Sequence, residues 1–204
     1  MEKLLPTQNM PDSVVQHLPV AEAAAQFVLE AVTASRSKDL QALKSQLDET
    51  MSAKTPPKNR LIRLRHIAGQ QSEIFSSKSA CSTGCSHCCH IDVTVPRSEA
   101  MLIGKMTGKR MSEPLETRTV DQPPANRFLG APCPFLVGGN CSIYKWRPLL
   151  CRALVNLDTS PKLCELVPDV TIPVPYLNST ELRAAFCIVT QSEDFADIRE
   201  WFTQ

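Results

Sequence analysis

The spacing of its cysteines constrains the fold of this chain more than any other sequence feature. Four cysteines fall within the ten residues CSTGCSHCCH at 81–90, and four more follow from Cys133 to Cys164. The Cys85-x2-Cys88 spacing is the short turn that lets two thiolates bind one metal ion. Because residues 90–132 separate the two groups, they can share a site only through the tertiary fold. A metal bound by both would link distant segments and add its binding energy to folding.

The candidate metal ligands are the eight cysteines of these two groups: Cys81, Cys85, Cys88, Cys89, Cys133, Cys141, Cys151 and Cys164. Neighbouring side chains in an extended backbone point in opposite directions, so Cys88 and Cys89 need a special turn to reach one ion. Two nearby centres, or a polynuclear iron–sulfur cluster, accommodate this pair more easily than a single tetrahedral zinc. Eight thiolates can fill two four-cysteine sites, or one site with the other cysteines structural or bridging. Zinc and iron–sulfur clusters both accept four thiolates, so the spacing leaves the metal open.

The remaining composition favours a cytoplasmic protein. The N-terminal MEKLLPTQNMPDS lacks the long apolar region of a signal peptide, and no window approaches the roughly 18 apolar residues of a membrane span. In a reducing cytosol, clustered cysteines bind metal or carry out redox chemistry more often than they form disulfides. The net charge of +1 gives no general attraction to nucleic acid or to an anionic membrane. We therefore expect a metal ion as a partner, and neither a membrane nor nucleic acid.

Several polar side chains near the cysteines are candidates for supporting roles. Four thiolates around a divalent ion leave about −2 on the site, so cations are expected close by. Lys145, Arg147 and Arg152 lie within the cysteine-bearing segment. They either compensate this charge or pair with surface carboxylates. His87 and His90 are expected to flank the site, since eight thiols already suffice as ligands.

The cysteine pattern resembles that of a known family. The C-x3-C-x2-C-C motif is followed by APCPFL, then by CSIYKWRPLLCRAL, and then by a later cysteine. This combination resembles the YkgJ-type cysteine-cluster family over about residues 80–165. The resemblance implies a zinc- or iron-chelating domain and gives the ligand role to the eight cysteines named above. Cys164 receives that role only through its downstream position. The catalytic residues, if there are any, stay unknown.

Helical periodicity dominates the first third of the chain. Apolar residues recur at spacings of three and four in residues 20–31 and 40–51, and again in a run that starts at Pro56-Pro57 and reaches Phe75. The prolines of residues 1–19 predict an irregular leader. The third run also carries the basic residues Arg60, Arg63 and Arg65. This basic face is either solvated or a docking patch for an acidic protein partner.

The pattern after residue 90 is mixed. Residues 91–95 alternate like a short strand, and Ser98 is expected to cap the helix that follows. The sequence Gly138-Gly139-Asn140 predicts a hairpin turn between residues 135–137 and 142–144. Residues 170–174 look extended, and a last helix is expected from about Thr180. Its Cys187 is interpreted as a small buried side chain.

The C-terminal tail has apolar residues to pack and acidic residues to expose. Ile198 and Trp201 are expected to be buried, with Glu193, Asp194, Asp197 and Glu200 outside. The whole pattern predicts a mainly α fold with a small β component. We expect a helical N-terminal extension at 1–79, an irregular cysteine-rich metal-binding domain at 80–190 and a helical tail at 191–204.

The function that these observations favour is metal binding, with iron in an iron–sulfur cluster or zinc as the cofactor. Its role would be structural, sensing, or delivery of metal or electrons to a protein partner. The alternative is a metal-cluster enzyme such as a protein lysine methylase, because flagellin lysine-N-methylases are similar in carrying a cysteine cluster of this type. The sequence shows no recognisable methyl-donor loop and only seven glycines, which disfavours that alternative. A thiol–disulfide oxidoreductase would need a thioredoxin-like context, which is not apparent. A nucleic-acid-binding zinc finger is disfavoured because the cysteine segment is not clearly basic.

Overall fold

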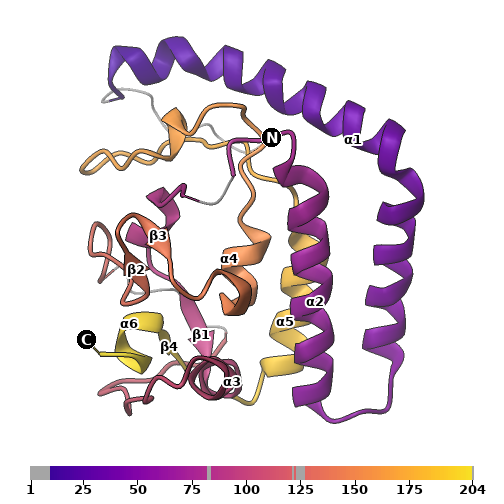
Figure 1. The fold of residues 1–204 in the computed structure, drawn as a ribbon, viewed down its shortest axis with the longest axis vertical. Helices are drawn as coiled ribbons and strands as arrows, with labels where there is room; N and C mark the ends of the chain where they lie inside the picture. The colour runs from indigo at the N-terminus through magenta and orange to yellow at the C-terminus, as the bar shows by residue number, and fades with distance from the viewer. Residues whose placement is uncertain (1–9, 82–83, 121, 123–126, 204) are drawn as a thin grey trace.

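The structure is a computed structural model that describes residues 10–81, 84–120, 122 and 127–203 (Figure 1). It is mainly helical with short strands, as the sequence predicts. Long helices form one side of the molecule, and the cysteine-bearing loops, hairpin and short helices form the other. The elements in chain order are α1 (Asp12–Ser52), α2 (Pro57–Ser76), η1 (His87–His90), β1 (Thr94–Pro96), α3 (Arg97–Thr107), β2 (Leu136–Val137), β3 (Asn140–Cys141), η2 (Tyr144–Trp146), α4 (Leu149–Ala153), η3 (Lys162–Cys164), α5 (Thr180–Thr190), β4 (Phe195–Asp197) and α6 (Ile198–Trp201), where η marks a 3-10 helix.

The first two predicted helical runs form one helix, α1, with a kink at Arg36 (φ −126°, ψ 22°). Its N-terminal arm crosses one end of the molecule in Figure 1, and its C-terminal arm runs back beside α2. The helix begins at Asp12, so the prediction of an irregular leader is wrong for residues 12–19; residues 1–9 lie outside the described chain. Pro19 lies inside the helix, where proline removes a backbone hydrogen bond. The helix nevertheless continues through Pro19, and on either side of it Val14 and Ala21 are buried against Leu163.

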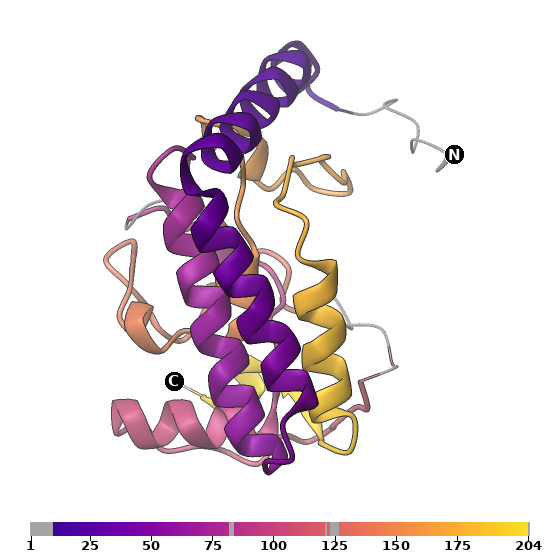
Figure 2. The ribbon, with the colours of Figure 1, turned by 90° about the vertical axis from the view of Figure 1, so that its right-hand side faces the viewer.

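The helix α2 lies at the centre of the helical side. Figure 2 shows the C-terminal arm of α1 in front of α2, with α5 beside them, and α2 also contacts α4. The predicted apolar face is confirmed: Leu61, Leu64, Ala68 and Phe75 are buried in the core that α2 shares with α1, α4 and α5. The N-terminal helices therefore pack directly on the segment that carries Cys151. The division of the chain at residues 79 and 190 stays a prediction.

The prediction that Arg65 belongs to an exposed basic face is wrong. It is buried, and its Nε lies 3.1 Å from Oε1 of the buried Glu99 at the start of α3. Its Nη2 donates to the carbonyls of Trp146 (2.7 Å) and Arg147 (3.2 Å). Glu99 Oε1 in turn accepts from the Leu149 N–H at 2.8 Å. A buried cation needs such partners, and here they tie α2 to the chain that enters α4.

The C-terminal residues form part of the cysteine-bearing side. Strand β4 pairs antiparallel with β1, with Val95 opposite Ala196. Ile198 and Trp201 are buried as predicted, and Trp201 Nε1 donates to the Val95 carbonyl at 2.8 Å. The prediction that Asp197 lies outside is wrong. Asp197 is buried, caps α6 through the Arg199 N–H and accepts from the Val93 N–H at 2.6 Å.

Two other local predictions need correction. The helix α3 begins at Arg97 after Pro96, so Ser98 lies inside it, where its backbone N–H and hydroxyl each donate to Glu193 at 2.8 Å. Residues 170–174 form no strand within the described chain; only Val170 makes an isolated bridge, to Val167. Helix α5 starts at Thr180, as expected. Among the described residues, no helix is long and apolar enough to cross a membrane.

Candidate metal centre

The first cysteine cluster folds into a tight turn followed by the 3-10 helix η1. Gly84, directly before Cys85, has φ +96°, a conformation that favours glycine. Cys88 and Cys89 both lie in η1. Successive residues of a 3-10 helix are rotated by about 120°, so these two adjacent thiols leave the backbone in different directions. This turn allows neighbouring cysteines to serve different parts of one site.

Backbone hydrogen bonds join η1 to the second cysteine segment. The Cys133 N–H donates to the Cys89 carbonyl at 2.8 Å, and the Gly130 N–H donates to the His90 carbonyl at 2.7 Å. Beyond Cys133, the predicted hairpin turn is confirmed at Gly138 (φ 54°) and Gly139 (φ 77°). The strands are shorter than expected, with Leu136 opposite Cys141, because residues 144–146 form η2. The turn thus brings Cys141 back toward Cys133.

The thiols of the two sequence groups meet around one small cavity of about 80 Å³. Its other walls are largely apolar and include Val93, Ile143, Leu154 and Ile198. An apolar wall disfavours an uncompensated thiolate, so negative charge in this cavity needs a cation. The seven cysteines that line the cavity are Cys81, Cys85, Cys88, Cys89, Cys133, Cys141 and Cys151.

Cys164 joins this arrangement through Asn156. The backbone N–H of Asn156 donates to Cys81 Sγ at 3.1 Å, and its side-chain Nδ2 donates to Cys164 Sγ at 3.3 Å. A second cavity, of about 300 Å³, is lined by Cys81, Cys85, Cys88 and Cys164 together with Asn156 and Tyr176. We call Cys81, Cys85 and Cys164 the Asn156 group, and Cys89, Cys133, Cys141 and Cys151 the hairpin group. Cys88, like Cys81 and Cys85, lines both cavities.

The loop that carries Asn156 is also tied to α1. Asp158 Oδ2 lies 2.8 Å from His17 Nε2, and the Asp158 N–H donates to Asn156 Oδ1 at 2.9 Å. The Asp158 carbonyl accepts from the Ala80 N–H at 2.6 Å, directly before Cys81. The N-terminal arm of α1 therefore helps to fix both cysteines that Asn156 contacts.

Burial determines the protonation of most thiols. It raises the pKa of Cys81, Cys141 and Cys151, that of Cys133 to about 11 and that of Cys164 to about 12. The pair in η1 differs, because the Cys89 thiol donates a hydrogen bond to Cys88. That bond lowers the pKa of Cys88 and raises the pKa of Cys89. Without metal, Cys88 is therefore the thiol of this pair that ionises first.

Of the three predicted supporting cations, Arg147 lies against the thiols. It lines their cavity, donates from Nη2 to Ser72 Oγ at 3.1 Å, and its guanidinium lies 3.7 Å from the centre of the Tyr144 ring. Burial has the largest effect on the pKa of Cys81 and Cys141, and the hydrogen bond from Cys89 has the largest effect on that of Cys88. In all three thiols the positive charge of Arg147 also acts to lower the pKa. Arg147 is thus placed to compensate thiolate charge.

The other two cations have different surroundings. Arg152 donates to the carbonyls of Arg147 (3.0 Å) and Lys145. Burial and then the neighbouring Arg65 lower the pKa of Arg152 to about 10. Lys145 lies over the Trp146 ring, with Nζ 5.3 Å from its centre. Arg152 therefore supports the backbone that leads into α4, and the contact of Lys145 is with an aromatic ring.

Sequence reasoning missed Arg199, which holds the loops that carry Cys89 and Cys133. Its guanidinium donates to four backbone carbonyls, those of Cys89 (3.1 Å), Ile91 (3.2 Å), Ala131 (2.6 Å) and Pro132 (3.2 Å). It also pairs with Asp197 at 2.9 Å, and both side chains are largely buried. Its only sequence signal is its place two residues after Asp197. That position gives no hint of contacts so distant in the chain.

The three residues expected to flank the site or to lie in the core have mixed outcomes. His87 lines the cavity of the Asn156 group, and His90 Nδ1 lies 3.1 Å from the Ser86 carbonyl oxygen. Cys187 is exposed on α5, so the prediction of a buried side chain is wrong. The helix turns Ala185, Phe186 and Val189 into the core instead, which places residue 187 on the outer face.

The donor set fits a thiophilic metal, since it supplies eight sulfur atoms in and around one apolar cavity. In the described residues, no group of three or more cysteine, histidine, aspartate or glutamate side chains is already arranged around a single ion position. The thiols surround the cavity without closing on one point. Zinc or iron would be held here by sulfurs of the Asn156 group, the hairpin group and Cys88.

Comparison with known proteins supports this interpretation of the cysteines. Neither the curated proteins nor the solved structures include a match to this chain. A family model, CxxCxxCC, described as "Putative zinc- or iron-chelating domain", matches residues 80–187, which is more than half of the 204 residues. The match extends past residue 165, where the sequence resemblance ended, and reaches into α5 as far as Cys187. The chain therefore belongs to the CxxCxxCC family of cysteine domains.

Proposed function

We propose that the eight thiols bind zinc or iron as two adjacent four-thiolate centres. The Asn156 group with Cys88 would supply one centre, and the hairpin group would supply the other. The observation that carries this proposal is the meeting of both groups at η1. Cys81, Cys85 and Cys88 line both cavities, while Cys89 packs in one apolar cluster with Cys133, Cys141 and Cys151. Four sulfur ligands complete a tetrahedral zinc site or the outer ligands of an iron–sulfur cluster.

The role we propose for the metal is to link segments that are far apart in the chain. The proposed ligands come from η1 and the chain before it, from the hairpin and the chain before it, from α4 and from η3. Burial raises the pKa of most of these thiols, including those of Cys133 and Cys164, so the bound metal would supply the charge balance that makes thiolates stable there. Iron as a cluster would add the capacity to carry an electron, and zinc would not. Cytoplasmic location, electron or metal delivery and lysine methylation stay predictions from the sequence.

Anaerobic purification tests the identity of the metal. We expect the native protein to retain zinc or iron through gel filtration. Brown protein with acid-labile sulfide identifies an iron–sulfur cluster, and colourless protein with stoichiometric zinc identifies a zinc site. Protein that is monodisperse, cooperatively folded and free of both metals would contradict the proposal.

Metal uptake is expected to release protons and to strengthen as the pH rises from about 6.5 to 8.5. The pKa of Cys133 is about 11 and that of Cys164 about 12 in the metal-free protein, so both thiols stay protonated across this range. Each must lose its proton to become a thiolate ligand, and mass action then favours the metal complex at higher pH. A pH indicator in weak buffer measures the protons released per metal. An affinity that does not change with pH would contradict thiolate ligation.

Replacing Asn156 by alanine is expected to weaken the centre formed by the Asn156 group. The substitution removes the Nδ2 donor to Cys164 Sγ, and such outer hydrogen bonds are worth about tenfold to a hundredfold in metal affinity. Competition with a chromophoric chelator measures this loss. Asn59→Ala, on the exposed face of α2, is the matched control and should keep the original affinity. Equal affinities for the two variants would remove Asn156 from the site.

A further inference from the structure

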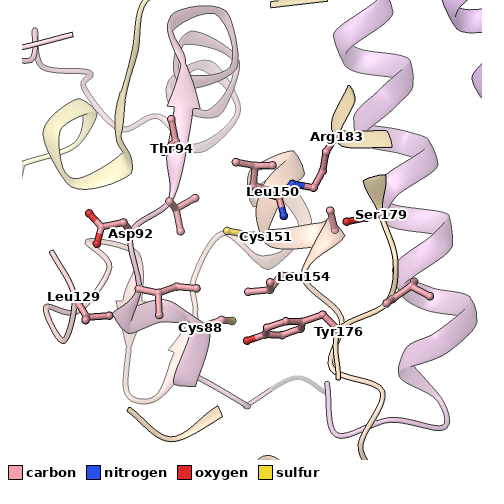
Figure 3. Close-up of a pocket in the computed structure, with 14 residues that line it drawn as sticks. Cys88, Asp92, Thr94, Leu129, Leu150, Cys151, Leu154, Tyr176, Ser179 and Arg183 are labelled. Carbon is pink, nitrogen blue, oxygen red and sulfur yellow. The ribbon is translucent and has the colours of Figure 1, made fainter. Parts of the chain in front are cut away.

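A separate cavity opens beside the thiols, and neither the family match nor the proposed metal site explains it. Its volume is about 410 Å³, within the range of small-molecule sites. Figure 3 shows three walls: the chain around Asp92 and Thr94, the helix α4, and the chain from Tyr176 to Arg183. At its base lie the sulfurs of Cys88 and Cys151, with the Tyr176 hydroxyl directed toward Cys88. The cavity therefore leads to thiols that belong to both proposed centres.

The lining separates into an apolar body and a polar end. The body consists of the aliphatic side chains of Ile91, Val93, Leu129, Leu150, Leu154 and Leu177. The polar end consists of Thr94, Ser179 and Arg183. In the described part of the chain, no side-chain hydrogen bond uses the hydroxyls of Thr94 or Ser179. These groups are free to bind a ligand.

Charge identifies the ligand class. Figure 3 shows the guanidinium of Arg183 directed into the cavity toward Leu150 and Cys151. Within the described residues, no carboxylate lies within 4.0 Å of it. Asp92 also lines the cavity, on the wall opposite Arg183 in the same view; its Oδ1 accepts from the Phe128 N–H at 3.2 Å, and its Oδ2 is buried without a hydrogen-bond partner among the described residues. Ser179 occupies the N-cap position of the 11-residue helix α5 without a capping hydrogen bond from its side chain, and the helix dipole adds positive potential there.

We propose that this cavity binds a small organic carboxylate. The carboxylate pairs with Arg183 and accepts from the Ser179 hydroxyl, and the aliphatic body lies between Val93, Leu150 and Leu154. The far end of the ligand then contacts Cys88 and Cys151. This site goes beyond metal chelation, because it places a second molecule against the sulfurs that would hold the metal.

Hexanoate, hexylamine and 1-hexanol test the proposal because they share a body and differ in charge. Ligand-observed saturation-transfer NMR on the full-length protein as purified measures binding up to about 10 mM. We expect saturable binding of hexanoate, with 1-hexanol at least about tenfold weaker and hexylamine without saturation. Equal binding of hexanoate and hexylamine, or no saturable binding of hexanoate, would overturn the carboxylate site.

Three variants locate the binding. Arg183→Gln should weaken hexanoate about tenfold, and Arg183→Lys should restore part of the affinity. Leu129→Asp at the exposed rim should also weaken it, through like-charge repulsion. Arg63→Gln, an exposed cation on α2, is the control and should bind like the original protein. Unchanged affinity in Arg183→Gln would contradict the site. Metal content measured on each sample separates this failure from a failure of metal binding.

Discussion

Replacement of Cys88 by serine is expected to remove metal and cooperative stability together. Cys88 lines both thiol cavities and accepts a hydrogen bond from Cys89 of the hairpin group, so its loss would leave one proposed centre without a fourth sulfur and disturb its neighbour. Since metal affinity at such a site is folding free energy, we expect a loss of about 3–5 kcal/mol. This corresponds to roughly 10 °C in the thermal midpoint for a chain of this size. Metal analysis and thermal unfolding on the same preparation measure both effects.

Cys187→Ser is the matched control for this variant. The control carries the same cysteine-to-serine change, but at an exposed position of α5 that does not line the cavity. A surface substitution of this kind changes stability by no more than about 0.5 kcal/mol and should leave the metal content unchanged. If both variants kept their metal and unfolded at the original temperature, Cys88 would have no role as a ligand.

Replacement of Arg199 by methionine is expected to be almost as disruptive, although Arg199 is not a metal ligand. Methionine fills much of the volume but removes the Arg199 donor from four carbonyls, of which that of Cys89 keeps only the Cys133 N–H. It also leaves Asp197 as a buried carboxylate without its cation. Removing one partner of a buried ion pair costs about 3–5 kcal/mol. The loops that carry Cys89 and Cys133 should then separate, so metal retention in the hairpin group should also fall.

Arg127→Met provides the comparison for Arg199. Arg127 is exposed, pairs with Glu116 and Glu200, and lies over the same Phe128 ring as Arg199. Its loss should change stability by no more than about 1 kcal/mol, because exposed ion pairs contribute little. Urea unfolding and metal analysis of both variants compare a carbonyl-binding arginine with a surface one. Similar mild effects would mean that Arg199 does not organise the site.

The elements that the sequence predicts well are those whose signals are local. The start of α5 at Thr180, the apolar face of α2 and the hairpin turn at Gly138-Gly139 each follow from a few neighbouring residues. Gly84 has a local signal of the same kind, because a glycine directly before the Cys85-x2-Cys88 turn tolerates a positive φ. Spacing also singled out the eight cysteines, although it could not divide them into groups.

The features that the sequence could not predict depend on partners distant in the chain. In sequence, Arg65 cannot be told from the exposed Arg63 until its contact with Glu99 is known. Pro19 and the leader prolines suggest irregular chain, yet Val14 and Ala21 have a buried partner in Leu163. Asn156 contacts Cys81 and Cys164 but is adjacent to neither of them in the sequence, so no local pattern identifies it. In each case tertiary contacts outweigh a local preference.

Counting protected thiols tests most directly the claim that eight cysteines bind metal in two centres. A mercurial reagent is titrated into the native, anaerobically purified protein while the released metal is followed. We predict that one thiol, that of the exposed Cys187, reacts without metal release, and that reaction of the other eight releases all of the metal. For zinc, about four protected thiols should correspond to each ion released. Four or fewer protected thiols per chain, or metal that stays bound after all nine have reacted, would contradict the account.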